Sequence, residues 1–150
     1  VLRECELDTI VRRAVRRFAG EFIGRKLKLC YEPLNASCVT DEKWLLFVVE
    51  QVLSNALKYT RTGSITIELE APKTLVIRDT GIGVAPEDLP RIFEKGYTGY
   101  NGRGDQKASG LGLYLCRTIC KRLGHTITAS SVPDHGTAIR IALEQRQIRE

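Results

Sequence analysis

Methionine, histidine and long apolar runs are scarce in this sequence. No methionine occurs among its 150 residues and the chain opens at Val1, so we expect a piece of a longer protein. The longest unbroken apolar run covers residues 44–49, far below the roughly 20 residues that a membrane-spanning helix needs. The start of the chain also lacks the basic, apolar and small-residue pattern of a signal peptide. We therefore expect this piece to be soluble.

The cysteines and histidines lack the spacing of a metal site. Five cysteines are present, an odd number, and no two of them form a Cys-x-x-Cys pair. With only two histidines in the chain, a four-ligand zinc site is hard to assemble. We expect reduced, mostly buried thiols, as is usual in the cytosol, rather than a disulfide framework.

The composition fits a single globular domain over residues 1–150. Hydrophobic residues make up 43% of the chain and charged residues 27%, the balance of a folded rather than a disordered protein. The length is enough to bury a substantial core but too short for two ordinary domains. No linker or internal repeat divides the sequence.

A net charge of +5 raises the question of an anionic partner. The densest basic stretch, residues 12–17, alternates with apolar residues at the spacing of one helix face. A solvated helix face is the simplest interpretation, and attraction to acidic lipid or to another anionic partner is the alternative. We predict no nucleic-acid binding, because the arginine face lacks interleaved aromatic residues and any recognition motif.

Periodicity and turn residues predict helices and strands that alternate irregularly. The predicted helices cover about 8–22, 42–59, 86–93 and 110–123, and the strands about 27–31, 36–39, 65–69, 75–78, 126–130 and 137–143. Residues 94–109 are rich in glycine and lack periodicity, which indicates a mobile loop. The pattern is typical of a layered α/β sandwich with a mixed sheet.

One face of the long helix gathers polar side chains. Gln51, Asn55, Lys58 and Tyr59 follow the spacing i, i+4, i+7 and i+8, so they share a face. An asparagine oxygen can coordinate Mg²⁺, a lysine can neutralise phosphate, and a tyrosine ring can lie against a base. Taken alone, a solvated polar stripe is the better explanation of this face.

A second group of residues follows the predicted strand 75–78. Asp79 is followed by Gly81 and Gly83, which allow the backbone to approach a flat ligand closely. The Asp79 carboxylate could accept a hydrogen bond from an adenine amino group. Turns of this composition are common, so the motif by itself is weak.

Two further segments suit phosphate groups. Gly110 to Leu113 open a predicted helix, whose free N–H groups and positive dipole end attract anions. The loop 94–109 before it carries Lys95, Arg103 and Lys107 and could close as a lid over a triphosphate. An ordinary loop-to-helix junction explains the first segment nearly as well.

In order along the chain, these motifs resemble the catalytic and ATP-binding domain of sensor histidine kinases. The matching segments are 55–60 (NALKYT), 79–83 (DTGIG), 92–95 (IFEK) and 110–113 (GLGL), and the likeness extends over roughly residues 5–145. This domain belongs to a superfamily shared with gyrase, the Hsp90 chaperones and the mismatch-repair ATPases. The resemblance implies a Bergerat-type ATP fold, a two-layer sandwich with a mixed sheet covered on one face by three helices, and a flexible lid over ATP and Mg²⁺.

The resemblance also implies roles for individual residues. Asp79 reads adenine with help from Thr137, Tyr59 lines the base, and Asn55 coordinates Mg²⁺. Phe93 anchors the lid by packing. Catalytic roles fall to Asn55 and Lys58. The residues implied to bind ATP are Asn55, Lys58, Tyr59, Asp79, Gly81, Ile82, Gly83, Thr98, Gly99, Arg103, Lys107, Gly110, Leu111, Gly112, Leu113 and Thr137.

Two departures from the family pattern bear on the chemistry. Gln51 stands where the family often has a second asparagine, a further candidate for Mg²⁺, and where the hydrolytic relatives have a glutamate that activates water. An amide is no general base, so Gln51 favours transfer to a protein over rapid hydrolysis. In the lid, Tyr97 is followed by Thr98 instead of an arginine, so Arg103 or Lys107 is expected to supply that charge. The lid segment 96–99 is more similar to that of short, antibiotic-responsive membrane kinases.

Neither histidine of the chain has the setting of a phosphate acceptor. His125 and His135 lie beside predicted strands, and no acidic residue follows either of them. The resemblance therefore implies an acceptor histidine on a separate dimerisation domain, a response regulator as the next partner, and a homodimeric parent protein at the cytoplasmic face of the membrane. A hydrolytic ATPase and a nucleotide-binding regulatory module without transfer activity remain alternatives.

Overall fold

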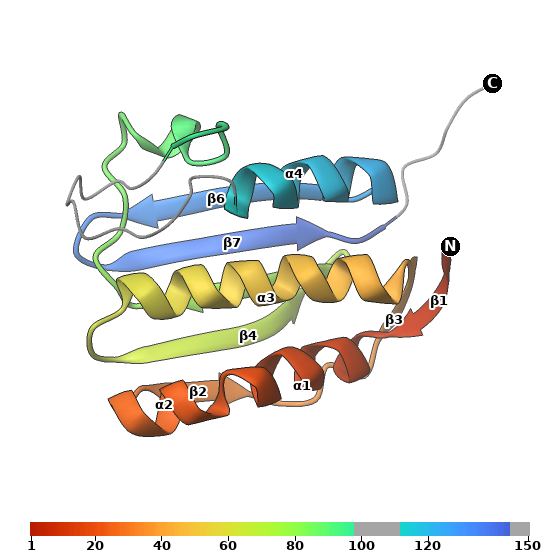
Figure 1. The fold of residues 1–150 in the computed structure, drawn as a ribbon, viewed down its shortest axis with the longest axis horizontal. Helices are drawn as coiled ribbons and strands as arrows, with labels where there is room; N and C mark the ends of the chain where they lie inside the picture. Colours follow the sequence, from red (N-terminus) through yellow and green to blue (C-terminus); the bar gives the residue numbers. More distant parts are fainter. Residues whose placement is uncertain (98–111, 145–150) are drawn as a thin grey trace.

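The computed structural model describes residues 1–97 and 112–144, which form one mixed sheet with helices against one face (Figure 1). The sheet has five strands in the order β2-β4-β5-β7-β6, and β2 is parallel to β4 while the other pairs are antiparallel. The strands are β2 (Lys28–Tyr31), β4 (Ser64–Glu70), β5 (Thr74–Asp79), β6 (Thr126–Val132) and β7 (Gly136–Ala142), and the helices are α1 (Leu7–Arg17), α2 (Ala19–Arg25), α3 (Glu42–Tyr59) and α4 (Gly112–Leu123). The predicted two-layer sandwich is confirmed.

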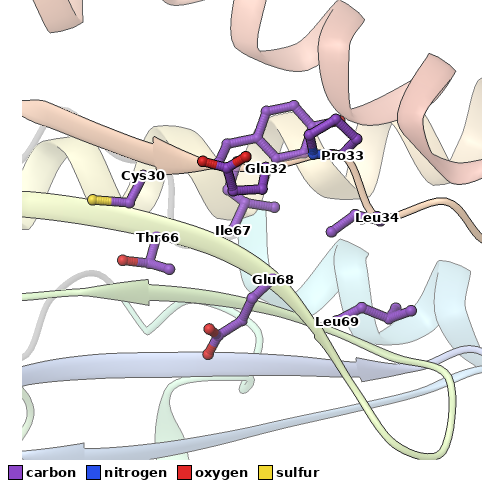
Figure 2. Close-up of a pocket in the computed structure, with 9 residues that line it drawn as sticks. Cys30, Glu32, Pro33, Leu34, Thr66, Ile67, Glu68 and Leu69 are labelled. Carbon is purple, nitrogen blue, oxygen red and sulfur yellow. The ribbon is translucent and has the colours of Figure 1, made fainter.

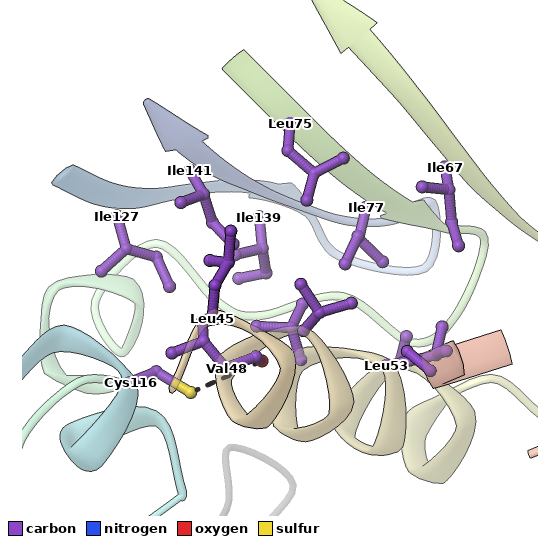
Figure 3. Packing of buried hydrophobic residues seen from close by; sticks show 14 of the residues in the cluster. Leu45, Val48, Leu53, Ile67, Leu75, Ile77, Cys116, Ile127, Ile139 and Ile141 are labelled. Atoms are coloured by element: carbon purple, nitrogen blue, oxygen red, sulfur yellow. Dashed lines mark hydrogen bonds between the residues drawn. The ribbon is translucent and has the colours of Figure 1, made fainter. Parts of the chain in front are cut away.

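Alternate residues of each strand point to the helices and form the core (Figure 3). Ile67 of β4, Ile77 of β5 and Ile141 of β7 are at most 2% exposed, and they meet the buried Leu45 and Leu53 of α3. This burial follows from the two-residue period of a strand, which directs every second side chain to the same face. The long helix α3 is therefore fixed over the middle of the sheet, with α1 on one side and α4 on the other (Figure 1).

The opposite face of the sheet carries ion pairs instead of a second helical layer. Arg78 on β5 donates to Glu68 and Glu70 of the adjacent β4, at 2.7 and 3.2 Å. Arg140 on β7 contacts Glu70 at 3.2 Å, so the charges link three neighbouring strands. Such cross-strand pairs suit a face that stays in contact with water.

Three elements differ from the sequence-based expectation. The predicted helix over 8–22 is two helices, because Phe18 leaves helical geometry with φ −104° and ψ 11° and α2 then begins at Ala19. The predicted helix over 86–93 is only the 3-10 turn η1 (Leu89–Arg91), since Pro90 lacks an N–H group and its ring would clash with the carbonyl four residues earlier. The short strand β1 (Arg3–Glu6), which pairs with β3 (Ser37–Thr40), was not predicted.

The cysteines of the fold are reduced and mostly buried. All five cysteines are free thiols, and four of them are buried. Residues 1–97 and 112–144 contain no group of three potential metal ligands. Every helix of this described part is too short or too polar to traverse a lipid bilayer.

Candidate nucleotide-binding site

Asp79 ends β5 on the side of the sheet that faces the helices, and its side chain is buried. The carboxylate Oδ1 accepts hydrogen bonds from the backbone N–H groups of Gly81, at 2.8 Å, and Thr137, at 3.2 Å. Burial raises the pKa of this carboxyl group, and the two hydrogen bonds oppose that rise. Oδ2 accepts no hydrogen bond from the described residues, so it is the oxygen that a ligand could reach.

The turn after Asp79 is enclosed so tightly that only glycine fits. A Cβ on Gly81 would lie 2.2 Å from the carbonyl oxygen of Tyr59, the last residue of α3. Gly83 has φ +74°, and a Cβ there would lie 2.4 Å from the carbonyl oxygen of Val132. The Ile82 N–H also donates to the Tyr59 carbonyl at 3.1 Å. The two glycines therefore seat the turn between the end of α3 and the β6–β7 hairpin.

Ser131 supports the site and was not predicted as part of it. It lies opposite Thr137 in the β6–β7 register, with 2.9 Å between the two hydroxyl oxygens. The Ser131 Oγ accepts from the Val84 N–H at 2.7 Å and donates to the Gly136 carbonyl at 2.8 Å. The sequence contained part of the evidence for Ser131, because residue 131 continues the alternation of inward-facing positions 127 and 129. The predicted strand, however, ended at residue 130.

The polar face of α3 lies beside this turn. Tyr59 is buried, Asn55 is half-buried and Lys58 is exposed. The Lys58 Nζ lies 5.3 Å from the centre of the Tyr59 ring, a cation–π contact. A Cβ on Gly112 would lie 3.1 Å from the Gln51 Oε1, so this face also meets the start of α4. The structure thus brings the asparagine helix, the Asp79 turn and the first residue of α4 together.

A buried hydroxyl next to Gly81 suits a polar ligand. Thr60 Oγ1 is buried and has no hydrogen-bond partner among the described residues. It lies 2.9 Å from the position that a Cβ on Gly81 would occupy. An unpaired buried hydroxyl costs about 1–3 kcal/mol, which a bound polar group or a water molecule would offset. Together with the Asp79 carboxylate, this hydroxyl fits a flat ligand rimmed by donors and acceptors, such as adenine.

Phe93 and the first residues of the predicted lid 94–109 contact α4. Phe93 is buried in the core, and the guanidinium of Arg117 lies 5.7 Å from the centre of its ring. Lys95 lies 5.9 Å from the ring of Tyr114, so a second cation–π contact joins this segment to α4. Leu113, in the first turn of α4, is buried as well. Six predicted ligands lie outside the described residues: Thr98, Gly99, Arg103, Lys107, Gly110 and Leu111.

A pocket of about 420 Å³ at the β2 edge of the sheet is a poorer match for a nucleotide (Figure 2). Its walls come from β2, the loop that follows it and β4. The charged side chains that line it are Glu32 and Glu68, which would repel phosphate groups. Among the described residues, the surroundings of Asp79 are therefore the better candidate site.

The two histidines differ in their access to solvent. His125 is 3% exposed, and its Nε2 lies 2.9 Å from the Thr40 Oγ1. Burial lowers the pKa of His125 to about 4. His135 is exposed on the β6–β7 hairpin. His125 is therefore a core residue that no external phosphoryl donor can reach in this fold.

The chain is an α/β sandwich in which the Asp79 carboxylate and its glycine turn lie beside the end of α3 and the start of α4. This arrangement is that of an adenine-nucleotide-binding domain. A family model described as "Histidine kinase-, DNA gyrase B-, and HSP90-like ATPase" matches residues 40–147. The chain belongs to this family. The resemblance to the ATP-binding catalytic domain of sensor histidine kinases is confirmed by relatives of that name.

Two curated relatives illustrate the similarity. Sensor histidine kinase YxdK of Bacillus subtilis is 35% identical over 141 residues, which cover 91% of this chain and 42% of that protein. Sensor protein kinase GraS of Staphylococcus aureus is 39% identical over 105 residues, which cover 68% of this chain and 30% of that protein. The chain therefore spans less than half the length of these relatives.

Solved structures share the fold. The mycobacterial sensor histidine kinase MprB superposes with a TM-score of 0.76 at 24% identity, covering 99% of this chain and 100% of that one. The catalytic domain of histidine kinase ThkA superposes with a TM-score of 0.81 at 19% sequence identity, and the match covers 96% of this chain and 99% of that one. Full-length ShkA, solved in complex with AMPPNP, superposes with a TM-score of 0.80 at 21% sequence identity, and the match covers 99% of this chain and 33% of that one. At these identities the likeness establishes the fold alone.

Proposed function

We propose that this chain binds ATP and presents its γ-phosphoryl group to a histidine that lies outside residues 1–150. The observation that carries the proposal is the buried Asp79, held by two backbone N–H groups beside the polar face of α3. A carboxylate oriented in this way can accept a hydrogen bond from the adenine amino group. Burying this carboxylate costs folding free energy, and the proposed role in recognising adenine would explain why it is buried.

The adenine and phosphate ends of the nucleotide would meet different residues. Asp79, Thr137 and the ring of Tyr59 would surround the base. Gly81 and Gly83 let the turn pack against the end of α3 and the β6–β7 hairpin, which holds Asp79 in place. Lys58, which is exposed, would approach the phosphates. The first turn of α4, at Gly112 and Leu113, adds N–H groups and the positive end of the helix dipole. We extend the proposal to the lid ligands Thr98, Gly99, Arg103, Lys107, Gly110 and Leu111, and to Ile82 in the turn.

Asn55 is the proposed Mg²⁺ ligand, and Gln51 is the further candidate. Both present amide oxygens, which suit a hard cation that also binds phosphate oxygens. When bound, Mg²⁺ would neutralise charge on the phosphate groups. The contribution of the chain itself is to present these amides on one face of α3, where the Gln51 side chain lies next to Gly112 at the start of α4.

The residues favour phosphoryl transfer over hydrolysis. Gln51 occupies the helix face where a general base would activate water, and an amide cannot accept that proton. The chain therefore contributes positioning and electrostatic stabilisation without a nucleophile of its own. A rapid rate of ATP hydrolysis by the isolated chain would instead identify a hydrolytic ATPase.

The partners follow from the missing acceptor. We infer that the accepting histidine belongs to a dimerisation domain of the parent protein, and that a response regulator receives the phosphoryl group from it. The length of the relatives, more than twice that of this chain, supports further domains in the parent. We also propose that the parent is a homodimer held at the cytoplasmic face of a membrane.

The decisive experiment is calorimetric titration with a non-hydrolysable ATP analogue, with and without Mg²⁺. We expect binding in the micromolar-to-millimolar range that strengthens when Mg²⁺ is present. Asn55→Asp should abolish ATP–Mg²⁺ binding, because it adds a negative charge beside the phosphates. Ser54→Asp, which adds the same charge at an exposed neighbouring position, is the matched control. Absence of binding to the folded wild-type chain would contradict the proposal.

A further inference from the structure

The positive charge of the chain is concentrated on α1, α2 and the start of β2. Residues 12–28 contain seven lysine or arginine side chains and one carboxylate, Glu21, for a net charge of +6. The whole chain carries +5, so all other residues together sum to −1. The basic character of this protein is therefore a local surface property and not a general one.

Some of these cations are engaged with α3. Arg13 pairs with Glu42 at 3.7 Å, and Arg17 pairs with Glu50 at 2.8 Å. Four others are exposed and form no salt bridge with any described residue: Arg12, Arg16, Lys26 and Lys28. We refer to these four as the basic edge.

Arg12 and Arg16 of the basic edge lie on α1, on the side of α3 opposite to α4, whereas Lys28 pairs with Ser64 of β4, whose N–H donates to the Thr80 Oγ1 at 3.0 Å. Figure 1 shows α1 and α2 on one side of α3 and α4 on the other, and β2 is the edge strand of the sheet. The Asp79 turn lies at the end of β5, two strands away from β2. Ile23 on α2 is 78% exposed among these charges. A broad partner that approaches along α1 therefore contacts the side of α3 opposite to α4.

We propose that the basic edge, with Ile23, is a docking surface for an anionic lipid bilayer. Anionic headgroups present negative charge over a wide area, which matches cations on α1, at the C-cap of α2 and at the start of β2. The long arginine and lysine side chains can reach headgroups while their stems stay against the protein. Ile23 supplies an apolar group that can enter the interface. Duplex DNA is a weaker match, because the edge offers no groove-reading element or interleaved aromatic side chain.

Vesicle co-sedimentation tests this surface. The whole chain is incubated with phosphatidylcholine vesicles, with the same vesicles containing phosphatidylglycerol, and with duplex DNA. We expect sedimentation with the anionic vesicles alone, and loss of it at high salt as the charges are screened. Equal binding to neutral vesicles, tighter binding to DNA, or no binding to anionic vesicles would overturn the proposal.

Matched variants separate this edge from net charge. Arg12→Gln, Arg16→Gln and Lys28→Gln together should weaken vesicle binding by about fivefold for each charge removed. The control combines Lys43→Gln, Lys121→Gln and Arg122→Gln, which removes the same charge from exposed residues of α3 and α4. Ile23→Ser should weaken binding without a change in charge. Circular dichroism and ATP-analogue binding should stay unchanged in all of them, which keeps this test separate from that of the nucleotide site. Equal weakening by the control set would contradict a localised surface.

Discussion

Burial raises the pKa of the Asp79 carboxyl group, so keeping it ionised at neutral pH costs folding free energy. Because the folded state binds the proton of this group more tightly than the unfolded state does, the contribution of Asp79 to the free energy of unfolding becomes less favourable as pH rises. The hydrogen bonds from Gly81 and Thr137 offset part of that cost. The proposed adenine role would account for a buried carboxylate at a position where it does not favour folding.

Asp79→Asn should separate these two requirements. The amide oxygen can still accept from Gly81 and Thr137, while its NH₂ group would face the adenine amino group with the wrong polarity. We expect loss of ATP-analogue binding in calorimetry and a melting temperature that is equal to or higher than that of the wild type. Glu87→Gln, which neutralises an exposed carboxylate nearby, should change neither quantity. Unchanged nucleotide affinity in a folded Asp79→Asn protein would refute the adenine role.

His125 should make stability depend on pH in the mildly acidic range. Its pKa is about 4 in the fold and about 6.5 when unfolded, so only the unfolded state takes up a proton between these values. Stability is therefore lost as pH falls from about 6.5 towards 4, by on the order of 2 kcal/mol. Urea unfolding at neutral pH and near pH 4.5 measures this loss.

Two histidine variants identify the source of that pH dependence. His125→Gln should remove most of the loss, although its stability at neutral pH will also be lower because the residue is buried. His135→Gln, at an exposed position, should retain the full loss. A wild-type protein whose unfolding free energy is the same at both pH values would contradict the assignment.

Among individual residues, the sequence predicted those site residues that form a recognisable motif with their immediate neighbours. The Asp79 turn was predictable because a carboxylate and two glycines follow each other directly. Ser131 and Thr60 were not predicted, because their importance depends on partners that only the folded chain brings close. A serine opposite Thr137 in a hairpin has no distinctive local pattern.

The C-terminal end of α3 depends on a side chain from another helix. The guanidinium of Arg25, at the end of α2, donates to the carbonyl oxygens of Leu57 and Thr60 at 2.7 and 2.8 Å. These carbonyls belong to the last turn, where intrahelical donors are missing. A charged donor there satisfies the carbonyls and complements the negative end of the helix dipole.

Arg25→Gln should therefore lower the free energy of unfolding by about 1 kcal/mol. Because the same turn of α3 leads into the Tyr59–Gly81 contact, nucleotide affinity should fall as well. Lys26→Gln removes a neighbouring charge that makes no such bonds, and it should leave stability within about 0.5 kcal/mol of the wild type. Denaturant unfolding of the three proteins compares them, and equal stability of Arg25→Gln would contradict the capping role.

Elements with strong periodicity were predicted well, and elements set by tertiary packing were not. The helix α3 and the strands β4, β5 and β7 lie within a few residues of their predicted bounds. The break at Phe18 was missed because apolar spacing continues through it, although Gly20 and Gly24 weaken helix formation nearby. The strand β1 has four residues and is defined by its pairing with β3, which local sequence does not encode.

On the scale of the whole molecule, neither histidine of the chain suits the role of phosphoryl acceptor: His125 is buried, and His135 is exposed but is followed by Gly136 instead of an acidic residue. We expect no phosphohistidine when the isolated chain is incubated with ATP and Mg²⁺, because His125 is buried in the core and His135 lies in a hairpin turn without the helical, acid-flanked setting of an acceptor. The full-length parent should become phosphorylated under the same conditions, and His135→Gln in that parent should not reduce the signal. Acid-labile phosphate on the isolated chain, detected by mass spectrometry, would contradict this prediction.

The layer arrangement could be predicted from the sequence, but the strand order could not. Irregular alternation of helices and strands indicated a mixed sheet with helices on one side. The parallel pairing of β2 with β4 requires a crossover through β3 and α3, and that choice depends on long-range contacts. The order β2-β4-β5-β7-β6, with β7 between β5 and β6, brings Thr137 next to Asp79 and so completes the site.

The ion pairs on the open face of the sheet also govern how two copies of this domain behave as neighbours. Stacking two such faces would strip water from Arg78, Arg140 and the glutamates between them, and the desolvation would exceed the gain from contact. Flat, apolar sheet faces adhere, whereas charged ones do not. If two copies are tethered as proposed, we therefore expect no lasting association through this face of the sheet.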